Sequence, residues 1–461
     1  MPVATSKADV IIIGSGQAGV PLATRLAGRG KTVVIAERGA LGGTCVNYGC
    51  TPTKTMIASA RAAHVARTAA RLGIRTGDIH VDLPAIVERK DAIVRRWRDG
   101  VEKRLQRAGE RVRIVRGHAR FVAERTVDIE GARYSAPIVV INVGTRATKP
   151  SIAGIEGVPW LDNHRVMDLR DLPAHLIVLG GGYIGCEFGQ MFRRFGSDVT
   201  IVHRGHHLLS HEDSDTAAAL EEALRSEGIR LEVAVQAKSL EATSGGVAIR
   251  LADDRELRGS HLLVATGRTP NTDDLGCREG GIDLDAQGFV AVDDAYRTSA
   301  EGVFALGDVN GGPQFTHTSW DDHRILFERL ISGHARPRSG RIVPFTVFTD
   351  PQFAGVGMTE EQARDEGVAY EVATMPFGRI ARAIEVGEQA GILKILLDPP
   401  TEKILGARIV GAEAGELIHV FVSLMQAGAT ARAIVDAEYV HPTFAEGVQS
   451  LVMCLPRYAL S

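Results

Sequence analysis

Long apolar runs are missing from the 461 residues of this chain. None approaches the roughly 18 consecutive apolar residues of a membrane-spanning helix, so the sequence predicts no membrane segment. We expect no signal peptide either, because the strand-like run Val10 to Ile13 lies close to the first residue and Gly14 follows it at once. Both absences favour a cytoplasmic protein.

An excess of charge of one sign is missing as well. The formal net charge is −3 and charged residues make up 24% of the chain, so the overall balance indicates neither a nucleic-acid nor a membrane partner. Between residues 89 and 116 Arg and Lys are dense, and Ile93, Trp97, Val101 and Leu105 recur every four residues. That spacing predicts an amphipathic helix with one apolar stripe and a solvated basic face.

Cysteine is scarce: the five cysteines are Cys45, Cys50, Cys186, Cys277 and Cys454. An odd number without an export signal is typical of a reducing compartment, where a close pair is more often catalytic than structural. We expect Cys186 to be a small buried hydrophobic residue, Cys277 to be a loop thiol, and Cys454 to stand alone. We expect no metal site.

What the chain does contain is a strand–glycine–helix unit that occurs twice. The first copy places Gly14, Gly16 and Gly19 between a strand (residues 9 to 13) and a helix, with Glu37 at the end of the next strand. Such a turn brings backbone N–H groups and a helix N-terminus to the phosphates of a dinucleotide. The acid about 20 residues later accepts hydrogen bonds from the ribose hydroxyls.

The second copy places Gly180, Gly182 and Gly185 after the strand 176 to 179. At its ribose-reading position it has His203 instead of an acid, followed by Arg204. An arginine can neutralise a 2′-phosphate that an acid would repel, so this copy favours NADPH over NADH. The alternative is that Arg204 is a solvated surface residue and that the site accepts either nucleotide.

The segment from Gly42 to Lys54 carries the close cysteine pair directly after the first ribose acid. The spacing alone leaves open half of a metal site or two spectator thiols. Pro52 suits the first turn of a helix, so we expect Cys50 near a helix N-terminus, where a thiol ionises more easily. A thiolate beside a bound dinucleotide is suited to a dithiol relay.

From about Val343 the pattern changes to alternating strands and helices, which predicts a separate α+β domain. The predicted strands are 345 to 348, 392 to 397 and 404 to 410, the last two joined as a hairpin by 398 to 401. The predicted helices are 416 to 427 and 444 to 453. Earlier, the segments 138 to 145 and 262 to 268 look like places where the chain crosses between layers.

Taken together, these motifs resemble the class I pyridine nucleotide–disulfide oxidoreductases, which include dihydrolipoamide dehydrogenase, glutathione reductase and mercuric reductase. The resemblance rests on Gly42 to Cys50 (Gly-Gly-Thr-Cys-Val-Asn-Tyr-Gly-Cys), Val264 to Arg268, Thr298 to Asp308 and His441 to Glu446. It covers essentially the whole chain. It implies an FAD enzyme that passes electrons from NADPH, or alternatively NADH, to a small disulfide or another thiol-reactive substrate.

The resemblance also implies a fold. We expect an α/β protein with two Rossmann-like dinucleotide-binding domains on parallel sheets and a C-terminal α+β dimerisation domain. The expected limits are 1–153 and 272–340 for the FAD-binding domain, 154–271 for the NAD(P)H-binding domain and 341–461 for the dimerisation domain. The resemblance further implies a homodimer whose active site is shared across the interface.

Four residues carry the expected chemistry. By resemblance, Cys50 is the flavin-proximal, charge-transfer thiol and Cys45 is the interchange thiol that meets the substrate. His441 is the acid–base and Glu446 orients it. Thiol–disulfide exchange needs a proton for the leaving sulfur, and histidine, which titrates near neutral pH, can supply it.

Further contacts follow from the same resemblance. Lys54 is expected near flavin N5, paired with Glu187 from the nicotinamide domain. The other expected FAD contacts are Gly14, Gly16, Gly19, Glu37, Arg38, Gly43, Thr44, the segment Gly117-His118-Ala119, Gly144, Thr145, Asp308, Phe315 and Thr316. The expected nicotinamide nucleotide contacts are Gly180, Gly182, Tyr183, Ile184, Gly185, His203, Arg204, Gly267 and Arg268.

The sequence leaves the family member open, with an NAD-linked dihydrolipoamide dehydrogenase or a mercuric reductase-like metal or oxidant reductase as the alternatives. A single cysteine near the end, Cys454, and the presence of His441 disfavour mercuric reductase. The absence of an acid at His203 disfavours dihydrolipoamide dehydrogenase, and the ending of the segment 49 to 54 differs from that of glutathione reductase. A flavoprotein redox sensor, with the basic helix as a docking face, is the alternative of a different class; a sensor does not need an acid–base paired with Glu446.

Overall fold

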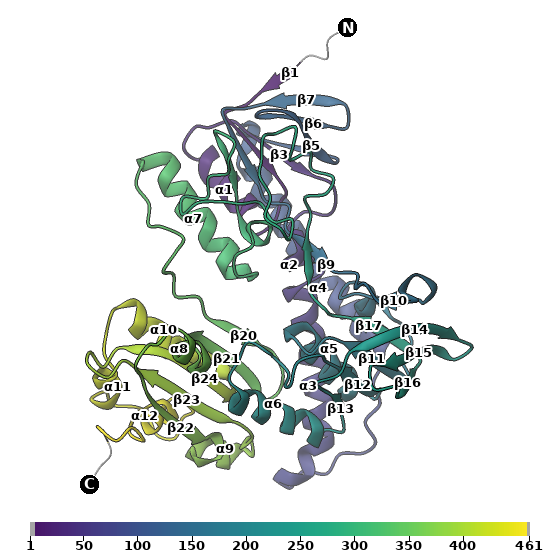
Figure 1. Cartoon of the computed structure of the whole chain (residues 1–461), viewed down its shortest axis with the longest axis vertical. Helices are drawn as coiled ribbons and strands as arrows, with labels where there is room; N and C mark the ends of the chain where they lie inside the picture. The colour runs from purple at the N-terminus through teal and green to yellow at the C-terminus, as the bar shows by residue number, and fades with distance from the viewer. Residues whose placement is uncertain (1–4, 459–461) are drawn as a thin grey trace. The chain divides into compact units, whose positions relative to one another are not determined.

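The computed structural model describes residues 5 to 458 (Figure 1). Its first sheet has five parallel strands in the order β19-β8-β2-β3-β4. Their bounds are β2 (Val10–Ile13), β3 (Val33–Glu37), β4 (Val112–Arg116), β8 (Ile138–Ile141) and β19 (Val303–Ala305). The central strands are apolar because both faces of the sheet are covered. On one face α1 (Gly19–Ala27) and α7 (Thr316–Ser332) pack together. Because α1 follows β2 after a short turn, the N-terminus of this helix lies at the end of that strand.

The other face is covered by a small sheet in the order β1-β7-β6-β5. Its strands are β1 (Thr5–Lys7), β5 (Ala119–Ala123), β6 (Thr126–Ile129) and β7 (Ala132–Ser135). Buried Phe121, Val127 and Tyr134 fill the space between the two sheets. The result is the helix–sheet–sheet layering of a dinucleotide-binding domain.

The second large sheet repeats this arrangement with parallel strands in the order β10-β17-β11-β12-β13. Its strands are β10 (Trp160–Leu161), β11 (His175–Leu179), β12 (Asp198–Val202), β13 (Arg230–Glu232) and β17 (His261–Val264). The helices α5 (Tyr183–Phe195) and α6 (Ser214–Ser226) accompany it. An antiparallel sheet of β14 (Ala237–Thr243), β15 (Gly246–Leu251) and β16 (Glu256–Gly259) shares a core with it.

The third large sheet is antiparallel, in the order β20-β21-β24-β23-β22. Its strands are β20 (Phe345–Val347), β21 (Gln352–Gly357), β22 (Glu371–Pro376), β23 (Ile392–Leu397) and β24 (Ile404–Gly411). Its helices are α8 (Glu360–Asp365), α9 (Ala381–Val386), α10 (Ala414–Gln426), α11 (Arg432–Val435) and α12 (Glu446–Val452). The predicted hairpin between β23 and β24 is confirmed. The three sheets confirm the predicted fold class of two parallel dinucleotide-binding sheets and a C-terminal α+β domain.

Three helices lie between β3 and β4: α2 (Gly43–Asn47), α3 (Cys50–Thr68) and α4 (Leu83–Arg107). The amphipathic helix expected between residues 89 and 116 ends at Arg107, and Val112–Arg116 is the strand β4. The single apolar stripe was wrong at Trp97, whose exposed fraction is 56%. Residues spaced by four drift about 40° around a helix at each step, so the expected stripe leaves the buried face. The buried face passes instead through Val87, Val94 and Leu105.

The chain divides into two compact units. One consists of residues 1–55, 87–148 and 267–341, and the other of residues 56–86, 149–266 and 342–461. In the first unit, β9 (Thr145–Ala147) pairs antiparallel with β18 (Arg268–Pro270). The two strands lie next to the unit boundaries at residues 148 and 267, close to the predicted crossings between layers. The four domain limits inferred from the sequence stay a prediction.

Candidate active site

The first glycine turn is closely packed. Gly14 has a φ of +103°, and a Cβ there would lie 2.3 Å from the carbonyl oxygen of Asn142. A Cβ at Gly19 would lie 2.2 Å from the Gly14 oxygen. Glu37 ends β3, and its Oε2 accepts from the N–H (2.9 Å) and hydroxyl (2.6 Å) of Ser15. The structure thus brings Gly14, Gly19 and Glu37 together at the edge where strands end and α1 begins.

Asn142 is a supporting residue of this turn that the sequence analysis missed. Its Oδ1 accepts from Gly19 N–H at 2.9 Å, and its amide nitrogen donates to Leu306 O at 2.9 Å. It thereby links the turn to the segment that leads to Asp308. A polar residue directly after the apolar run of β8 was the available signal.

The predicted segment Gly117-His118-Ala119 lies at the same edge as Glu37. Gly117 donates its N–H to Glu37 O at 3.0 Å, which places the segment leading to Ala119 beside Glu37. Arg38, by contrast, is exposed and pairs with Asp274 at 3.2 Å. The backbone oxygen of Asp274 also lies 3.0 Å from Nε2 of His118.

The cysteine segment is packed against the first turn. Gly43 begins α2 with a φ of +63°, and a Cβ there would lie 2.7 Å from Cα of Gly16. Thr44 and Cys45 follow within α2, and Cys50 is the first residue of α3. The expected position of Cys50 at a helix N-terminus is therefore present in the structure.

Asn47 and Arg98 hold this segment in place, and the sequence analysis missed both. The buried amide of Asn47 donates to the carbonyl oxygens of Leu41 (3.0 Å) and Gly43 (2.9 Å). Its Oδ1 accepts from Nε and Nη2 of Arg98, at 3.0 and 2.8 Å. The one sequence signal for Arg98 was its place in the predicted amphipathic helix, next to the apolar positions of α4.

The two sulfurs are present as a dithiol pair, and Cys45 is hydrogen-bonded to Cys50. That bond, burial and the charge of Cys50 raise the pKa of the Cys45 thiol. Thr316, which begins α7, opposes the rise by a hydrogen bond to Cys45, and its Oγ1 lies 3.3 Å from Cys50 Sγ. Lys54 opposes it through its charge. The raised pKa keeps the proton on Cys45 at neutral pH.

Asp308, Thr145 and Arg268 form a polar cluster next to this pair. Thr145 Oγ1 donates to Asp308 Oδ2 at 3.1 Å and accepts from Arg268 Nε at 2.7 Å. Burial raises the pKa of the Asp308 carboxyl, and the charge of Arg268 opposes the rise. Burial lowers the pKa of Arg268, whereas the charges of Asp308 and Cys50 raise it. Arg268 therefore lies within the electrostatic reach of the cysteine pair.

Gly144 and Gly267, two glycines with positive φ angles, lie next to this cluster in the chain. Gly144 has a φ of +64° and accepts at its oxygen from Asn271 N–H at 3.1 Å. Gly267 has a φ of +142° and accepts from Thr148 N–H at 3.0 Å. Phe315, the residue before α7, stacks on His317 with ring centroids 5.2 Å apart.

Replacing Thr316 with valine tests the contribution of its hydroxyl to the cysteine pair. Valine keeps the shape but removes the hydrogen bond that stabilises negative charge on sulfur. We expect the reduced Thr316→Val variant to react with iodoacetamide on the order of ten-fold more slowly near pH 7. Thr318→Val is the matched control, because the buried Thr318 hydroxyl has no hydrogen-bond partner among residues 5 to 458. Equal rates in wild type and Thr316→Val would contradict the assignment.

The second glycine turn repeats the packing of the first. Gly180 has a φ of +110°, and a Cβ there would lie 2.3 Å from Ala265 O. A Cβ at Gly185 would lie 1.9 Å from Gly180 O. The turn runs through Gly182 into α5, which begins with Tyr183 and Ile184. Each copy of the unit therefore places a helix N-terminus over a close-packed glycine turn.

Aromatic residues of β20 and its flank lie against the beginning of α5. The ring of Tyr183 stacks on Phe345 with centroids 5.3 Å apart, and burial raises the pKa of its hydroxyl. Glu187, one turn later, is 6% exposed, and its Oε1 accepts from Phe348 N–H at 2.9 Å. Lys54 and Glu187 belong to different compact units, and their pairing stays a prediction.

His441 and Glu446 are brought together at the start of α12. Nδ1 of His441 lies 2.9 Å from Glu446 Oε2. The His441 side chain is 69% exposed, whereas that of Glu446 is 20% exposed. The Thr443 hydroxyl donates to Val440 O at 2.7 Å and accepts from Glu446 N–H at 3.3 Å, which fixes the local turn. A carboxylate on Nδ1 leaves Nε2 as the nitrogen that can exchange a proton with a ligand.

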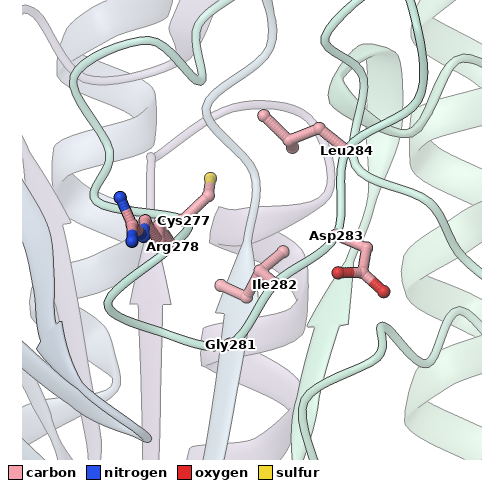
Figure 2. A pocket seen from close by; sticks show the side chains of 6 residues that line it. All are labelled: Cys277, Arg278, Gly281, Ile282, Asp283 and Leu284. Atoms are coloured by element: carbon pink, nitrogen blue, oxygen red, sulfur yellow. The ribbon is translucent and has the colours of Figure 1, made fainter.

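The remaining cysteines lie apart from these residues. Cys186 is fully buried, and burial raises the pKa of its thiol. Cys277 lines a pocket of about 340 Å³ whose lining residues all come from the loop 277 to 284 (Figure 2). Burial raises the pKa of Cys277 to about 11, so this thiol is a poor nucleophile at neutral pH. Cys454 is exposed.

Comparison with known proteins reveals the family. A family model described as pyridine nucleotide-disulphide oxidoreductase matches residues 8–322, and the model of its dimerisation domain matches residues 343–452. A mercuric reductase of Lysinibacillus sphaericus is 33% identical over 445 residues, which are 96% of this chain and 81% of that protein. A dihydrolipoyl dehydrogenase of Thermus scotoductus is 33% identical over 462 residues, 98% of each chain.

A solved structure agrees with these relatives. The Cu(II) complex of the HOCl-induced flavoprotein disulfide reductase RclA from Escherichia coli matches with a TM-score of 0.89 and 32% identity, over 97% of this chain and 99% of that one. This chain therefore belongs to the pyridine nucleotide-disulphide oxidoreductase family. It is an oxidoreductase of a family that depends on FAD and uses pyridine nucleotides, and it carries the family's dimerisation domain. Among residues 5 to 458, no helix combines the length and apolar content needed to cross a bilayer.

Proposed function

We propose that this protein is an NADPH-dependent disulfide reductase that uses FAD and the Cys45–Cys50 pair to reduce a small disulfide or another thiol-reactive compound. The observation that carries the proposal is the asymmetry of the dithiol. Cys50 is the first residue of α3, where a helix N-terminus favours a thiolate, and the pKa of the Cys45 thiol is raised by its bond to Cys50 and by burial. Cys50 is therefore suited to exchange electrons with a donor, whereas Cys45 keeps its proton until a base removes it in the presence of substrate.

The residues around the first turn fit FAD. The closely packed glycines of that turn let α1 begin directly after β2, where its N-terminus would receive a pyrophosphate. The Glu37 carboxylate retains acceptor capacity for ribose hydroxyls. Asp308, buried beside Thr145, can accept from a hydroxyl of the ribityl chain. Bound FAD would supply the two-electron exchange between nicotinamide and disulfide. Lys54 and Arg268 would balance the negative charge that the site gains with the Cys50 thiolate.

His441 is the proposed acid–base of the substrate half. Cys45 loses its proton to Nε2 of His441 when it attacks the substrate disulfide, and the same nitrogen then protonates the leaving thiol. The Cys50 thiolate then attacks Cys45 in the mixed disulfide, which releases the second half of the substrate as a thiolate and leaves Cys45–Cys50 oxidised. Val440 and His441 are strongly exposed, at 75% for Val440. This exposure and the dimerisation domain support a homodimer in which His441 serves the partner subunit's cysteines.

Anaerobic titration of the purified protein with NADPH, and separately with NADH, tests the proposal. A thiolate held against oxidised flavin gives a long-wavelength charge-transfer band, so we expect this band to grow during uptake of the first two electrons. NADPH is expected to produce it at lower concentration than NADH, because Arg204 can meet the 2′-phosphate. Bleaching of the flavin without the band would contradict the coupling of Cys50 to flavin and the proposed route.

A soft metal ion is the second candidate substrate. The adjacent sulfurs of Cys45 and Cys50 are the specific observation that favours it, because thiolates bind soft metals. The related RclA has been solved as a Cu(II) complex, and reduction of Cu(II) gives Cu(I), the soft ion that thiolates bind. NADPH oxidation that depends on Cu(II) and exceeds the rate with every disulfide in a panel would favour the metal ion over a disulfide.

A further inference from the structure

The segment that joins the two proposed redox cysteines has little secondary structure of its own. The helix α2 has five residues and contains Cys45, whereas Cys50 begins α3. So short a helix is not stable in water without tertiary support. A Cβ at Gly49 would lie 3.0 Å from Thr44 O and 3.4 Å from Cα of Cys45, so the chain turns back tightly before Cys50. The separation of the two sulfurs therefore depends on the contacts that fix α2.

Asn47, the last residue of α2, supplies part of that support. Its side chain is buried, and its amide nitrogen donates to Leu41 O at 3.0 Å and to Gly43 O at 2.9 Å. Both carbonyls precede Cys45 in the chain, whereas Asn47 follows it. These hydrogen bonds therefore close the backbone around Cys45 into a ring, and rotation of the amide would open that ring.

Arg98 fixes the orientation of this amide. The Asn47 oxygen Oδ1 accepts from Nε of Arg98 at 3.0 Å and from Nη2 at 2.8 Å. A guanidinium group can only donate, so the amide oxygen must face Arg98 and the NH₂ group must face the backbone carbonyls. The reverse orientation would place donors against donors and acceptors against acceptors. The forked contact thus holds the amide in the orientation that closes the ring around Cys45.

The helix that carries Arg98 is itself anchored in the core of the first compact unit. Val94 and Leu105 of α4 are 7% and 1% exposed, and Leu105 packs in one cluster with Ile35 of β3. Arg98 and Asn47 both belong to this unit. The guanidinium group therefore connects the cysteine segment to the helix-covered face of the first sheet.

The two cysteines stay together although no covalent bond joins them. Both are free thiols in this structure, and Cys45 is hydrogen-bonded to Cys50. Closing a disulfide costs conformational entropy if the two sulfurs can separate in the reduced state. Contacts that hold the reduced pair together remove much of this cost, so they favour the disulfide over the dithiol.

We propose that Arg98 is a positioning residue that sets the redox equilibrium of the Cys45–Cys50 pair, because its forked contact with Asn47 keeps the two sulfurs within bonding reach. This inference rests on the proposed function and names the residue that tunes its redox pair. Formation of the disulfide joins the two sulfurs and passes two electrons to another disulfide. The S–S bond of that disulfide is cleaved, and two protons from the pair and the solvent complete its two thiols.

The test measures this equilibrium in the FAD-loaded protein. Wild type and Arg98→Gln are equilibrated anaerobically at several ratios of reduced to oxidised dithiothreitol, quenched in acid and alkylated. Mass spectrometry of the peptide that carries residues 45 and 50 then gives the oxidised fraction. We expect the equilibrium constant for disulfide formation to fall on the order of ten-fold in Arg98→Gln, because hydrogen bonds from a charged group are lost. For this two-electron couple, that change raises the reduction potential by about 30 mV.

Matched variants identify the cause of the shift. Arg96→Gln, which changes an exposed arginine of the same helix, should have the wild-type constant. Asn47→Ala alone should lower the constant, and adding Arg98→Gln to it should change the constant little further, because both changes break the same contact. Arg98→Lys, which keeps the charge but not the fork, should shift the constant in the same direction as Arg98→Gln, and it replaces that variant if the glutamine protein does not fold with FAD.

Several results would overturn the inference. One is a wild-type constant in Arg98→Gln with an intact flavin spectrum and melting temperature, and another is a wild-type constant in Arg98→Lys. A full additional shift in the double variant would show that Arg98 does not act through Asn47. The measurement needs no NADPH, so each of these results leaves the proposed function standing. A wild-type protein that forms no Cys45–Cys50 disulfide at any ratio would remove both the inference and the proposed function.

Discussion

Cys45→Ser is expected to abolish disulfide turnover while NADPH still reduces the flavin. Serine cannot attack a disulfide, so steady-state reduction of any disulfide substrate should fall by roughly 10³-fold or more. Cys50 then has no partner for an internal disulfide and remains a thiolate beside Arg268, whose pKa the charge of Cys50 raises. We therefore expect the variant to show the charge-transfer band before any reductant is added, as recorded in the visible spectrum.

Two further variants complete this experiment. Cys50→Ser should lose the band in every redox state as well as the turnover. Cys454→Ser changes an exposed cysteine outside the proposed site and should behave as wild type. If Cys45→Ser reduced a disulfide within a few-fold of the wild-type rate, Cys45 would not be the sulfur that meets the substrate. A band that persisted in Cys50→Ser would reverse the roles of the two cysteines.

His441→Gln is expected to lower disulfide turnover by about 10²- to 10⁴-fold, the usual contribution of a general acid–base. The reason lies partly in Cys45: its pKa is raised, so at neutral pH the sulfur carries a proton that a base must remove. Without His441 the attacking thiolate must come from direct ionisation. Turnover of the variant should then rise with pH by up to about ten-fold per pH unit through the neutral range, because the thiolate fraction grows in that proportion below the pKa.

The flavin half of the reaction separates this effect from misfolding. Reduction of flavin by NADPH does not use His441, so its rate in His441→Gln should match the wild type. His80→Gln, which removes an exposed histidine from a loop without an assigned role, is the control for both halves. A variant whose turnover falls little and keeps the wild-type pH profile would remove His441 from the mechanism and would favour the redox-sensor alternative.

Local patterns predicted much of the fold, since the signals concerned lie within one or two elements. The two glycine turns, the parallel strands before them, the helix that begins at Cys50 and the strand β23 all have short-range signatures. The pairing of His441 with Glu446 could be predicted for the same reason, because they are only five positions apart in the sequence. Their catalytic roles stay predictions.

Supporting contacts across long stretches of chain could not be predicted. Asn142 bonds to Gly19 and to Leu306, which are 123 and 164 residues away, and its place after the apolar run of β8 marks a polar residue but identifies neither partner. Arg98 reaches Asn47 across 51 residues from a helix whose buried face was misplaced by following every fourth residue. Likewise, the sequence showed that His203 is not an acid, but only the geometry showed that its Nδ1 accepts from Gly181 N–H at 3.1 Å and its Nε2 lies 2.7 Å from the Ser210 hydroxyl.

The interleaving of the two compact units affects how the chain can be made. The first sheet begins with β2 at Val10, yet one of its edges is β19, which pairs with β8 only after residue 303 has been synthesised. A nascent chain that stops earlier leaves β8 as an open edge, and open edges recruit strands from other chains. Neither unit is a continuous stretch, so neither can be released from the ribosome as a finished part. We expect truncated products of this gene to aggregate or be degraded rather than to accumulate as half-enzymes.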